Sequence, residues 1–351
     1  MMMPGLWLRL MRGPERRAIT SVKSLVSTGL VAREDETALS KVEANFSTRL
    51  TPEVLKQIKL ATLDDPVYRQ YVPHTDELNF RADERADPIG DKINSPVKGI
   101  IHRYPDRLLL TPTHTCAVYC RFCFRRENVG KAEASLNKAE MDTAMAYIDA
   151  HTEVSEVILS GGDPLILSDR RLAEILHRLA GIAHIQVIRL HTRVPLVEPS
   201  RITPALIKLM RIRPAVYMVL HVNHVAELSV PVKKAMARLA RAGIPLLSQS
   251  VLLKGVNDSA ETLEELFRAL VANRVKPYYL HHLDKAQGTS HFRVSIARGQ
   301  AIMRALRGRL SGIAQPTYVI DIPGGHGKVP IGPEYLSVNE IVDPKGRRHQ
   351  I

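Results

Sequence analysis

Short apolar runs and amphipathic stretches alternate along most of the chain, from about Tyr104 onward. The runs are rich in Val, Ile and Leu, and the stretches between them carry apolar residues at helical spacing. This alternation is typical of repeated β-strand and α-helix units around a parallel sheet. The sequence therefore predicts an α/β fold, a partial or full parallel (βα) barrel of about six to seven units.

The apolar runs and the helical periodicity also predict the individual elements. The expected strands are Arg107–Leu110, Val157–Ser160, Val187–Leu190, Val216–Leu220, Leu246–Val251, Tyr278–His282 and Thr317–Ile320. The expected helices are Lys138–Ala150, Asp169–Ala180, Pro204–Met210, Val232–Ala242, Ala260–Val271 and Ile296–Leu306. Ser168, Thr203 and Ser259 precede three of these helices and are expected to cap them.

The pattern divides the chain into three parts. Residues 1–100 contain helical stretches such as Pro52–Leu63 between prolines, and we expect them to form a helical appendage that covers one end of the barrel. The Arg-rich start, Met1–Arg17, has no apolar core followed by a cleavage site, so we interpret it as a frayed terminus. Residues 101–322 are expected to form the barrel. Residues 323–351 are expected to carry a functional loop and a Gly- and Pro-rich tail that closes over the site.

The composition narrows the class of protein. Of the 351 residues, 45% are hydrophobic and 24% are charged, as in a typical soluble protein. No apolar run reaches the ~18 residues of a membrane helix, which excludes an integral membrane protein. Only three cysteines occur, which favours a reducing, cytoplasmic location. The net charge of +13 is scattered along the helices, so we do not expect a nucleic-acid partner.

All three cysteines lie close together, directly after the first predicted strand. Cys116, Cys120 and Cys123 follow the pattern Cys-x-x-x-Cys-x-x-Cys, with Phe122 before the last one. Three thiolates can hold three irons of a [4Fe–4S] cluster and leave the fourth iron open. Structural zinc normally needs four ligands, so a zinc site would require His114 as the fourth. A third alternative is that the thiols hold no metal.

Further polar residues stand at the carboxyl ends of the other strands, where parallel barrels build their sites. A turn with two glycines, which let a backbone approach a ligand closely, follows the second strand. Each of these residues could also be an ordinary cap or rim residue. The candidates are Ser160, Gly161, Gly162, Asp163, His191, Arg193, His221 and Gln249.

A second glycine-rich turn, Pro323–Pro330, carries Lys328. It is not a phosphate-binding P-loop, because Val329 stands where Ser or Thr would follow the lysine. A lysine on such a turn is suited to form a Schiff base with pyridoxal phosphate. By itself, however, the turn favours an ordinary solvated loop lysine.

The cysteine loop resembles that of the radical S-adenosylmethionine superfamily. The resemblance implies that Cys116, Cys120 and Cys123 bind the cluster and that its open iron chelates S-adenosylmethionine, whose reductive cleavage yields a 5′-deoxyadenosyl radical. It also implies that the Gly161-Gly162 turn binds the methionine amino group. The rim residues would complete the S-adenosylmethionine site.

Three motifs together resemble the lysine 2,3-aminomutase family over roughly residues 60 to 340. They are His102–Arg107, the cysteine loop and Asp321–Lys328. The resemblance implies a catalytic Lys328 that binds pyridoxal phosphate, with Arg103, Tyr104 and Arg107 around its phosphate. It also implies that Arg125 pairs with the substrate carboxylate.

Two carboxylates bear on the substrate. Asp284 and Asp321 end the last two predicted strands, so they can face one cavity and bracket an ammonium group. In lysine-specific members of the family, aspartates at these positions bind the ε-ammonium, so the resemblance implies L-lysine as substrate and β-lysine as product. The alternative is that the two aspartates form structural salt bridges with Lys285 or Arg293.

The chain departs from the metabolic members of the family in one respect. It lacks their C-terminal zinc cysteines, with Ser259 where one would fall, and its tail is short. This points to the compact branch that supplies β-lysine for modification of elongation factor P, although the Gly-Gly-His-Gly-Lys turn is more similar to the metabolic enzymes. A flavodoxin or ferredoxin as electron donor and a homo-oligomer are further expectations. The rival functions are a radical enzyme that modifies RNA or a different amino acid, and a zinc-binding interaction module.

Overall fold

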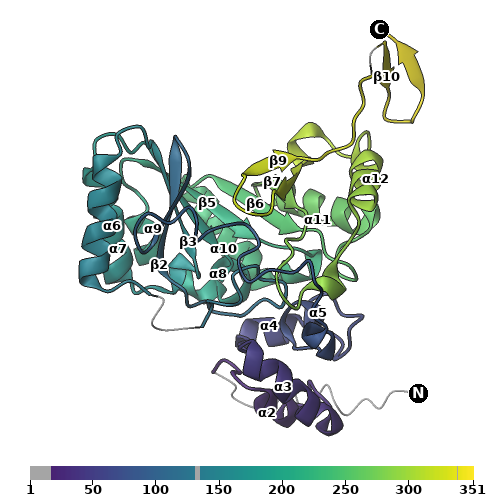
Figure 1. Cartoon of the computed structure of the whole chain (residues 1–351), viewed down its shortest axis with the longest axis horizontal. Coiled ribbons are helices and arrows are strands. Elements are labelled where there is room, and N and C mark those ends of the chain that lie inside the picture. The colour runs from purple at the N-terminus through teal and green to yellow at the C-terminus, as the bar shows by residue number, and fades with distance from the viewer. Residues whose placement is uncertain (1–16, 131–134, 338) are drawn as a thin grey trace.

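In the part of the chain that the structure describes, nine strands form one curled sheet in chain order, β1 to β9 (Figure 1). The computed structural model describes residues 17–130, 135–337 and 339–351, so most of Met1–Arg17 lies outside the described residues. Strands β2 to β8 pair in parallel, whereas β1 and β9 pair antiparallel with β2 and β8. The strands are β1 (Ile100–Tyr104), β2 (Arg107–Thr113), β3 (Glu156–Gly161), β4 (Val187–Thr192), β5 (Ala215–His221), β6 (Leu246–Val251), β7 (Val275–His281), β8 (Thr317–Asp321) and β9 (Lys328–Pro330).

The predicted fold is confirmed as a partial barrel. The seven parallel strands are the seven predicted ones, and the sheet stays open because β1 and β9 are its two edges. Helices cover its outer face (Figure 1). They are α6 (Lys138–Ala150), α7 (Asp169–Gly181), α8 (Val194–Val197), α9 (Pro204–Leu209), α10 (Val230–Arg241), α11 (Ala260–Ala272) and α12 (Ile296–Leu306).

The local chemistry of the chain explains why these helices begin where they do. Ser168, Thr203 and Ser259 each accept a hydrogen bond from the backbone of the third residue after them, as predicted. Asn137 and Glu140 form a capping box at the start of α6. The apolar faces of the helices pack on buried Val, Ile and Leu of the parallel strands, which forms one continuous core.

The N-terminal part contains α2 (Val22–Ser27), α3 (Glu36–Asn45), α4 (Pro52–Gln57) and α5 (Tyr68–Tyr71), which lie beside one end of the sheet (Figure 1). The predicted helix Pro52–Leu63 is wrong beyond Gln57. Asp65 accepts hydrogen bonds from the backbone N–H groups of Lys59 and Leu60, at 2.7 and 3.0 Å. These bonds replace the helical ones and turn the chain.

The prediction that the tail closes over the site is wrong beyond Ile331. Gly324, Gly325 and Gly327 have positive φ values between 91° and 95°, and this turn brings Lys328 back onto the edge of the sheet as β9. The chain then runs along α12 and ends in a hairpin, β10 (Glu340–Val342) and β11 (Arg348–Gln350), which projects away from the sheet (Figure 1).

No helix among the described residues is both long enough and apolar enough to cross a membrane.

A buried ion network joins the N-terminal part to the cysteine loop. Glu77, whose side chain is fully buried, pairs with Arg121 at 2.6 Å and also with Arg126. The backbone N–H of Arg121 donates to the carbonyl of Gln70 at 2.8 Å. Because an unpaired buried charge is costly, these bonds lock the loop against the N-terminal part.

We expect Glu77→Gln to lower the free energy of unfolding by about 3 kcal/mol or more, because two buried guanidinium groups lose their shared counter-charge. Urea denaturation followed by circular dichroism measures this loss. Glu261→Gln is the matched control, since Glu261 forms an exposed pair with Arg309, and little change is expected there. Equal effects of the two substitutions would contradict the role of the network.

Candidate active site

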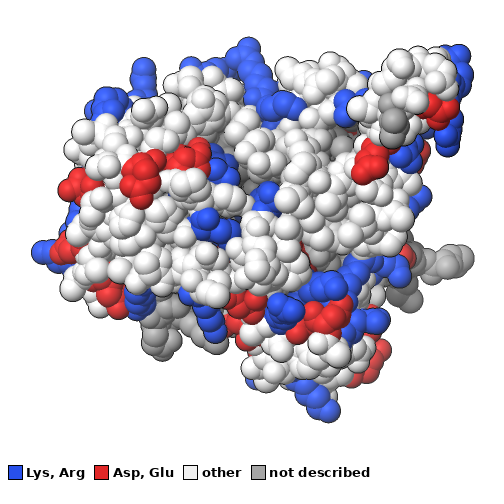
Figure 2. Space-filling model, turned by 45° about the horizontal axis from the view of Figure 1, so that its top comes forward, with Lys and Arg blue, Asp and Glu red and all other residues white. Residues whose placement is uncertain are grey.

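One cavity of about 670 Å³ lies in the concave side of the curled sheet. Figure 2 shows a hollow bordered by basic side chains near the middle of one face of the molecule, with acidic and basic side chains interspersed around it. Every residue that the sequence assigns to the site lines this cavity. They are Arg103, Tyr104, Arg107, Cys116, Cys120, Cys123, Arg125, Ser160, Gly161, Gly162, Asp163, His191, Arg193, His221, Gln249, Asp284, Asp321 and Lys328.

The cysteine loop follows β2 and places all three thiols on this cavity. Burial, reinforced by the neighbouring Cys120, raises the pKa of Cys123 to about 11. Such thiols ionise when a metal binds them, so the donor set fits a metal centre. Three thiolates on one loop can hold an iron–sulfur cluster, in which each thiolate binds a different iron.

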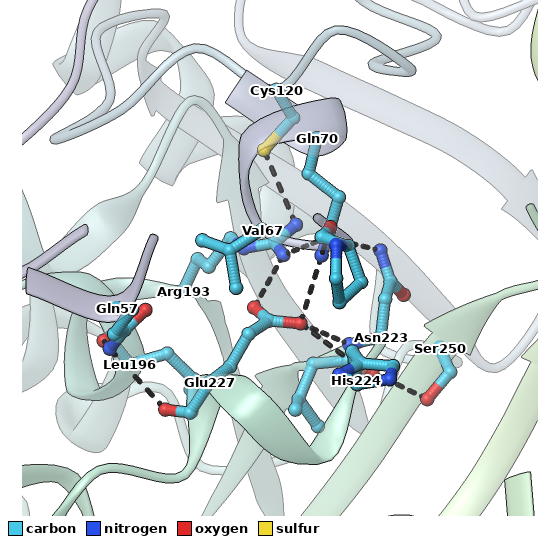
Figure 3. Close-up of polar contacts among 12 residues, drawn as sticks. Gln57, Val67, Gln70, Cys120, Arg193, Leu196, Asn223, His224, Glu227 and Ser250 are labelled. Atoms are coloured by element: carbon cyan, nitrogen blue, oxygen red, sulfur yellow. Dashed lines mark hydrogen bonds and ion pairs between the residues drawn. The ribbon is translucent and has the colours of Figure 1, made fainter. Parts of the chain in front are cut away.

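Arg193 lies next to the cysteine loop. Its Nη1 donates to Cys120 Sγ at 3.4 Å, and its Nη2 donates to Gln70 Oε1 at 2.5 Å and Glu227 Oε2 at 2.7 Å (Figure 3). Its buried Nε has no hydrogen-bond partner among the described residues, so one donor remains for a bound group. The sequence placed Arg193 on the rim, but it did not indicate Gln70 or Glu227.

The glycines after β3 serve the packing of the chain itself. A Cβ on Gly162 would lie 2.2 Å from the carbonyl oxygen of Thr115, and Gly161 has a φ of 98°. The turn therefore docks against the backbone of the cysteine loop. Asp163 accepts hydrogen bonds from Thr192 Oγ1 and the Arg193 N–H, both at 2.7 Å. Its carboxylate is thus used to join β3 to β4.

The rim residues on β4, β5 and β6 form one polar cluster. Gln249 Nε2 hydrogen-bonds with His191 Nδ1 at 3.3 Å and with His221 Nε2. Burial lowers the pKa of His221 to about 3 and that of His191 well below its ordinary value, so both rings are neutral. His191 Nε2 is buried without a partner among the described residues, and it can bind a polar group of a ligand.

Lys328 stands opposite Asp321 in the β8–β9 ladder. Its Nζ contacts the Asp321 carboxylate and lies 3.3 Å from His281 Nδ1, while its backbone N–H donates to the Tyr104 hydroxyl at 2.7 Å. Burial opposes ionisation of Asp321, but His281 and Lys328 outweigh it and hold the pKa of Asp321 well below its ordinary value. Lys328 therefore points into the cavity beside an ionised acid.

Three arginines face the same region. Arg107 stacks on the Tyr104 ring at 3.9 Å. Arg103 lies 3.5 Å from Asp321 and 3.6 Å from Asp91, and its buried Nε has no partner among the described residues. Arg125 pairs with Asp91 at 2.7 Å. The set fits a site for anionic groups, because guanidinium groups bind phosphate and carboxylate oxygens.

Asp284 differs from Asp91 and Asp321, which are paired with cations. Burial and the neighbouring Asp321 raise its pKa to about 7. The alternative salt bridges are wrong, because Lys285 and Arg293 both pair with Asp83, at 3.0 and 2.9 Å. In the described part of the chain, the Asp284 carboxylate has no ion-pair partner.

Sequence reasoning did not single out Asp91, Tyr279 and His281, which are among the further residues that line the cavity. The alternation of side chains along a strand could have indicated two of these residues, since Tyr279 and His281 lie two residues apart on β7 and share a face. Asp91 lies on an irregular segment of the N-terminal part, where no periodicity indicates which side chains face the site.

Known protein families and proteins are similar to most of the chain. A model of the radical SAM superfamily matches residues 110–270, and a model described as lysine-2,3-aminomutase matches residues 303–341. L-lysine 2,3-aminomutase of Acetoanaerobium sticklandii is 40% identical over 92% of this chain and 78% of its own length. The Escherichia coli (strain K12) protein of the same name is 41% identical over 82% of this chain and 83% of its own length. Glutamate 2,3-aminomutase of Clostridioides difficile (strain 630) is 36% identical over 91% of this chain and 75% of its own length.

The radical SAM match implies a [4Fe–4S] cluster and S-adenosylmethionine as cofactors. The shared name of most of these relatives describes an isomerase that acts on lysine. With this identity over most of both chains, the protein belongs to the lysine 2,3-aminomutase family of the radical SAM superfamily.

Proposed function

We propose that the protein interconverts L-lysine and β-lysine by moving the amino group between C2 and C3, with pyridoxal phosphate bound to Lys328. The observation that carries this proposal is the position of Asp284, which lines the cavity without an ion-pair partner among the described residues. Asp91 and Asp321 have cationic partners in Arg125 and Lys328, whereas Asp284 has none among the described residues. A side-chain ammonium group of the substrate can supply a cation to the Asp284 carboxylate.

The two aspartates of the cavity disfavour glutamate, the substrate named for one relative. A side-chain carboxylate would have to enter beside Asp284 and the ionised Asp321, where like charges repel. Lysine places its carboxylate and its ε-ammonium at opposite ends. Arg125 is suited to the first and the two aspartates to the second.

The residues around Lys328 fit pyridoxal phosphate. Lys328 provides an amine that points into the cavity, and the unpartnered Nε of Arg103 together with Arg107 and Tyr104 can bind a phosphate. When bound, the cluster and S-adenosylmethionine supply a radical that removes and returns one hydrogen atom, and pyridoxal phosphate holds the migrating amino group.

The chain's own residues position these groups and control charge. Asp321 is the counter-ion of Lys328, and His281 beside it is neutral because burial and the charge of Lys328 lower its pKa to about 4. Asp91 orients Arg125 toward the cavity.

Several expectations stay predictions. These are the supply of β-lysine for elongation factor P, a flavodoxin or ferredoxin as electron donor, a homo-oligomer and a cytoplasmic location.

Anaerobic incubation of cluster-loaded protein with S-adenosylmethionine, pyridoxal phosphate, a reductant and L-lysine tests the function. We expect β-lysine by chiral chromatography, dependent on both small-molecule cofactors, and no β-glutamate when L-glutamate replaces lysine. Formation of 5′-deoxyadenosine without β-lysine would show that lysine is the wrong substrate.

Lys328→Ala is expected to abolish β-lysine formation, because the cofactor loses its attachment point. Borohydride reduction of the wild-type protein, followed by peptide mass spectrometry, should find the pyridoxyl group on Lys328 and nowhere else. Lys233→Ala, on the exposed face of α10, is the control and should retain turnover. A pyridoxyl group on another lysine would sink the assignment.

Asp284→Asn should stabilise the substrate-free protein at high pH. The folded protein keeps a proton on Asp284 up to a pH of about 7, whereas the unfolded chain releases it near its ordinary pKa of 3.8. The wild type therefore loses stability as pH rises through this window, and the variant does not. Between about pH 4 and about pH 8, the free energy of unfolding of the variant should therefore rise relative to that of the wild type by on the order of 4 kcal/mol.

Urea denaturation at the two pH values measures this gain. Asp83→Asn is the matched control, because hydrogen bonds from Arg293 and Lys285 lower the pKa of Asp83 to about 2. That variant should gain no stability over the same range. If the effect of Asp284→Asn on stability does not depend on pH, the pKa of Asp284 in the folded protein is not raised.

A further inference from the structure

We propose that Arg193 raises the reduction potential of the cluster by donating a hydrogen bond to the thiolate of Cys120, and that Glu227 and Gln70 hold Arg193 in place. The inference concerns one-electron reduction of the cluster by an external donor, in which the cluster gains one electron and no bond forms. It rests on the cluster of the family and not on the choice of lysine as substrate.

The first step of the argument is the position of the guanidinium group. Arg193 follows β4, its side chain is 7% exposed, and it lies between the rings of Tyr71 and Phe122, at 4.9 and 5.4 Å from their centroids. One of its nitrogens, Nη1, is 3.4 Å from Cys120 Sγ (Figure 3). In the described part of the chain, no other charged side chain donates a hydrogen bond to a cysteine sulfur.

The second step is that this position is fixed. Glu227 accepts from Arg193 at 2.7 Å and from the backbone N–H groups of Asn223 and His224 at 2.8 and 2.9 Å. Gln70 accepts from Arg193 and from Asn223 Nδ2, at 2.5 and 3.0 Å, and it donates to Glu227 at 3.3 Å. Glu227 and Gln70 are buried, so the network is sheltered from water.

The third step is electrostatic. Reduction adds one negative charge to the cluster, and hydrogen bonds to the cysteine sulfurs stabilise the more negative state. In a buried site the N–H donor and the positive charge of Arg193 act with little screening. Glu227 has the opposite sign and lies farther from the sulfur, beyond Arg193. The two residues should therefore move the potential in opposite directions.

The test is a potentiometric titration of cluster-loaded protein, followed by the electron paramagnetic resonance signal of the reduced cluster. We expect Arg193→Gln to disfavour the reduced state about tenfold, which is a shift of about 59 mV to more negative potential for a one-electron couple. Glu227→Gln should shift the potential to more positive values. Arg193→Lys keeps the positive charge but lacks the planar guanidinium group. Its reduction potential should therefore lie between those of Arg193→Gln and the wild type.

Arg201→Lys is the matched control, because Arg201 is a partly buried arginine that binds the carbonyl oxygens of Leu165 and Leu167 away from the cysteines. The reduction potential of the cluster in the Arg201→Lys protein should equal that in the wild type. Potentials of the loaded Arg193→Gln and Glu227→Gln proteins that both match the wild type, or that both shift in the same direction, would overturn the proposal. If Arg193→Gln fails to hold the cluster, Glu227→Gln and Arg193→Lys decide the question by the sign of their shifts. Because the readout is the cluster alone, an absence of β-lysine formation does not affect it.

Discussion

A charge that leaves water must meet an opposite charge, and this requirement organises the interior around the cysteine loop. Glu77 neutralises Arg121 and Arg126 behind the loop, and Glu227 neutralises Arg193 on another side of it. Each pair joins segments that are far apart in the sequence. Electrostatic pairing thereby holds a loop without helix or strand structure in a defined place, which a cluster with three thiolate ligands requires.

The same requirement accounts for the two charged regions of the cavity. The guanidinium groups of Arg103 and Arg125 both lie near Asp91, which balances their charge. Near the ends of β7 and β8, two acids face a single lysine, and the acid without a cation keeps its proton near neutral pH. This arrangement supports the proposed preference for a substrate with an extra ammonium group.

Much of this could be predicted from the sequence, because the relevant signals are local. Periodicity found the parallel strands, and side-chain caps found the helix starts to within a few residues. The helix after Pro52 was predicted too long, since its end depends on the hydrogen bonds of Asp65 with Lys59 and Leu60. All the rim candidates share one cavity because parallel strands end at one edge of the sheet. Their individual roles beyond this placement stay predictions.

The partners of the site residues could not be predicted in the same way. Gln70, Asp91 and Glu227 act through contacts across the fold, and a polar residue in an irregular segment carries no periodic sign of where it will point. The expected division at residues 100 and 323 stays a prediction, and the parts that it separates are in contact at the site. Gly90 lies against Gly325, where a Cβ would come within 2.6 Å of the backbone.

That contact has a mechanical consequence. The N-terminal segment crosses the turn that carries Lys328, and the same segment supplies Asp91 to Arg125 and Gln70 to Arg193. One stretch of chain therefore touches the cluster loop, the arginine expected at the substrate carboxylate and the turn of the cofactor lysine. Any displacement of this stretch would disturb all three together. The N-terminal part thus also contributes to the wall of the site, through Ile89 and Asp91.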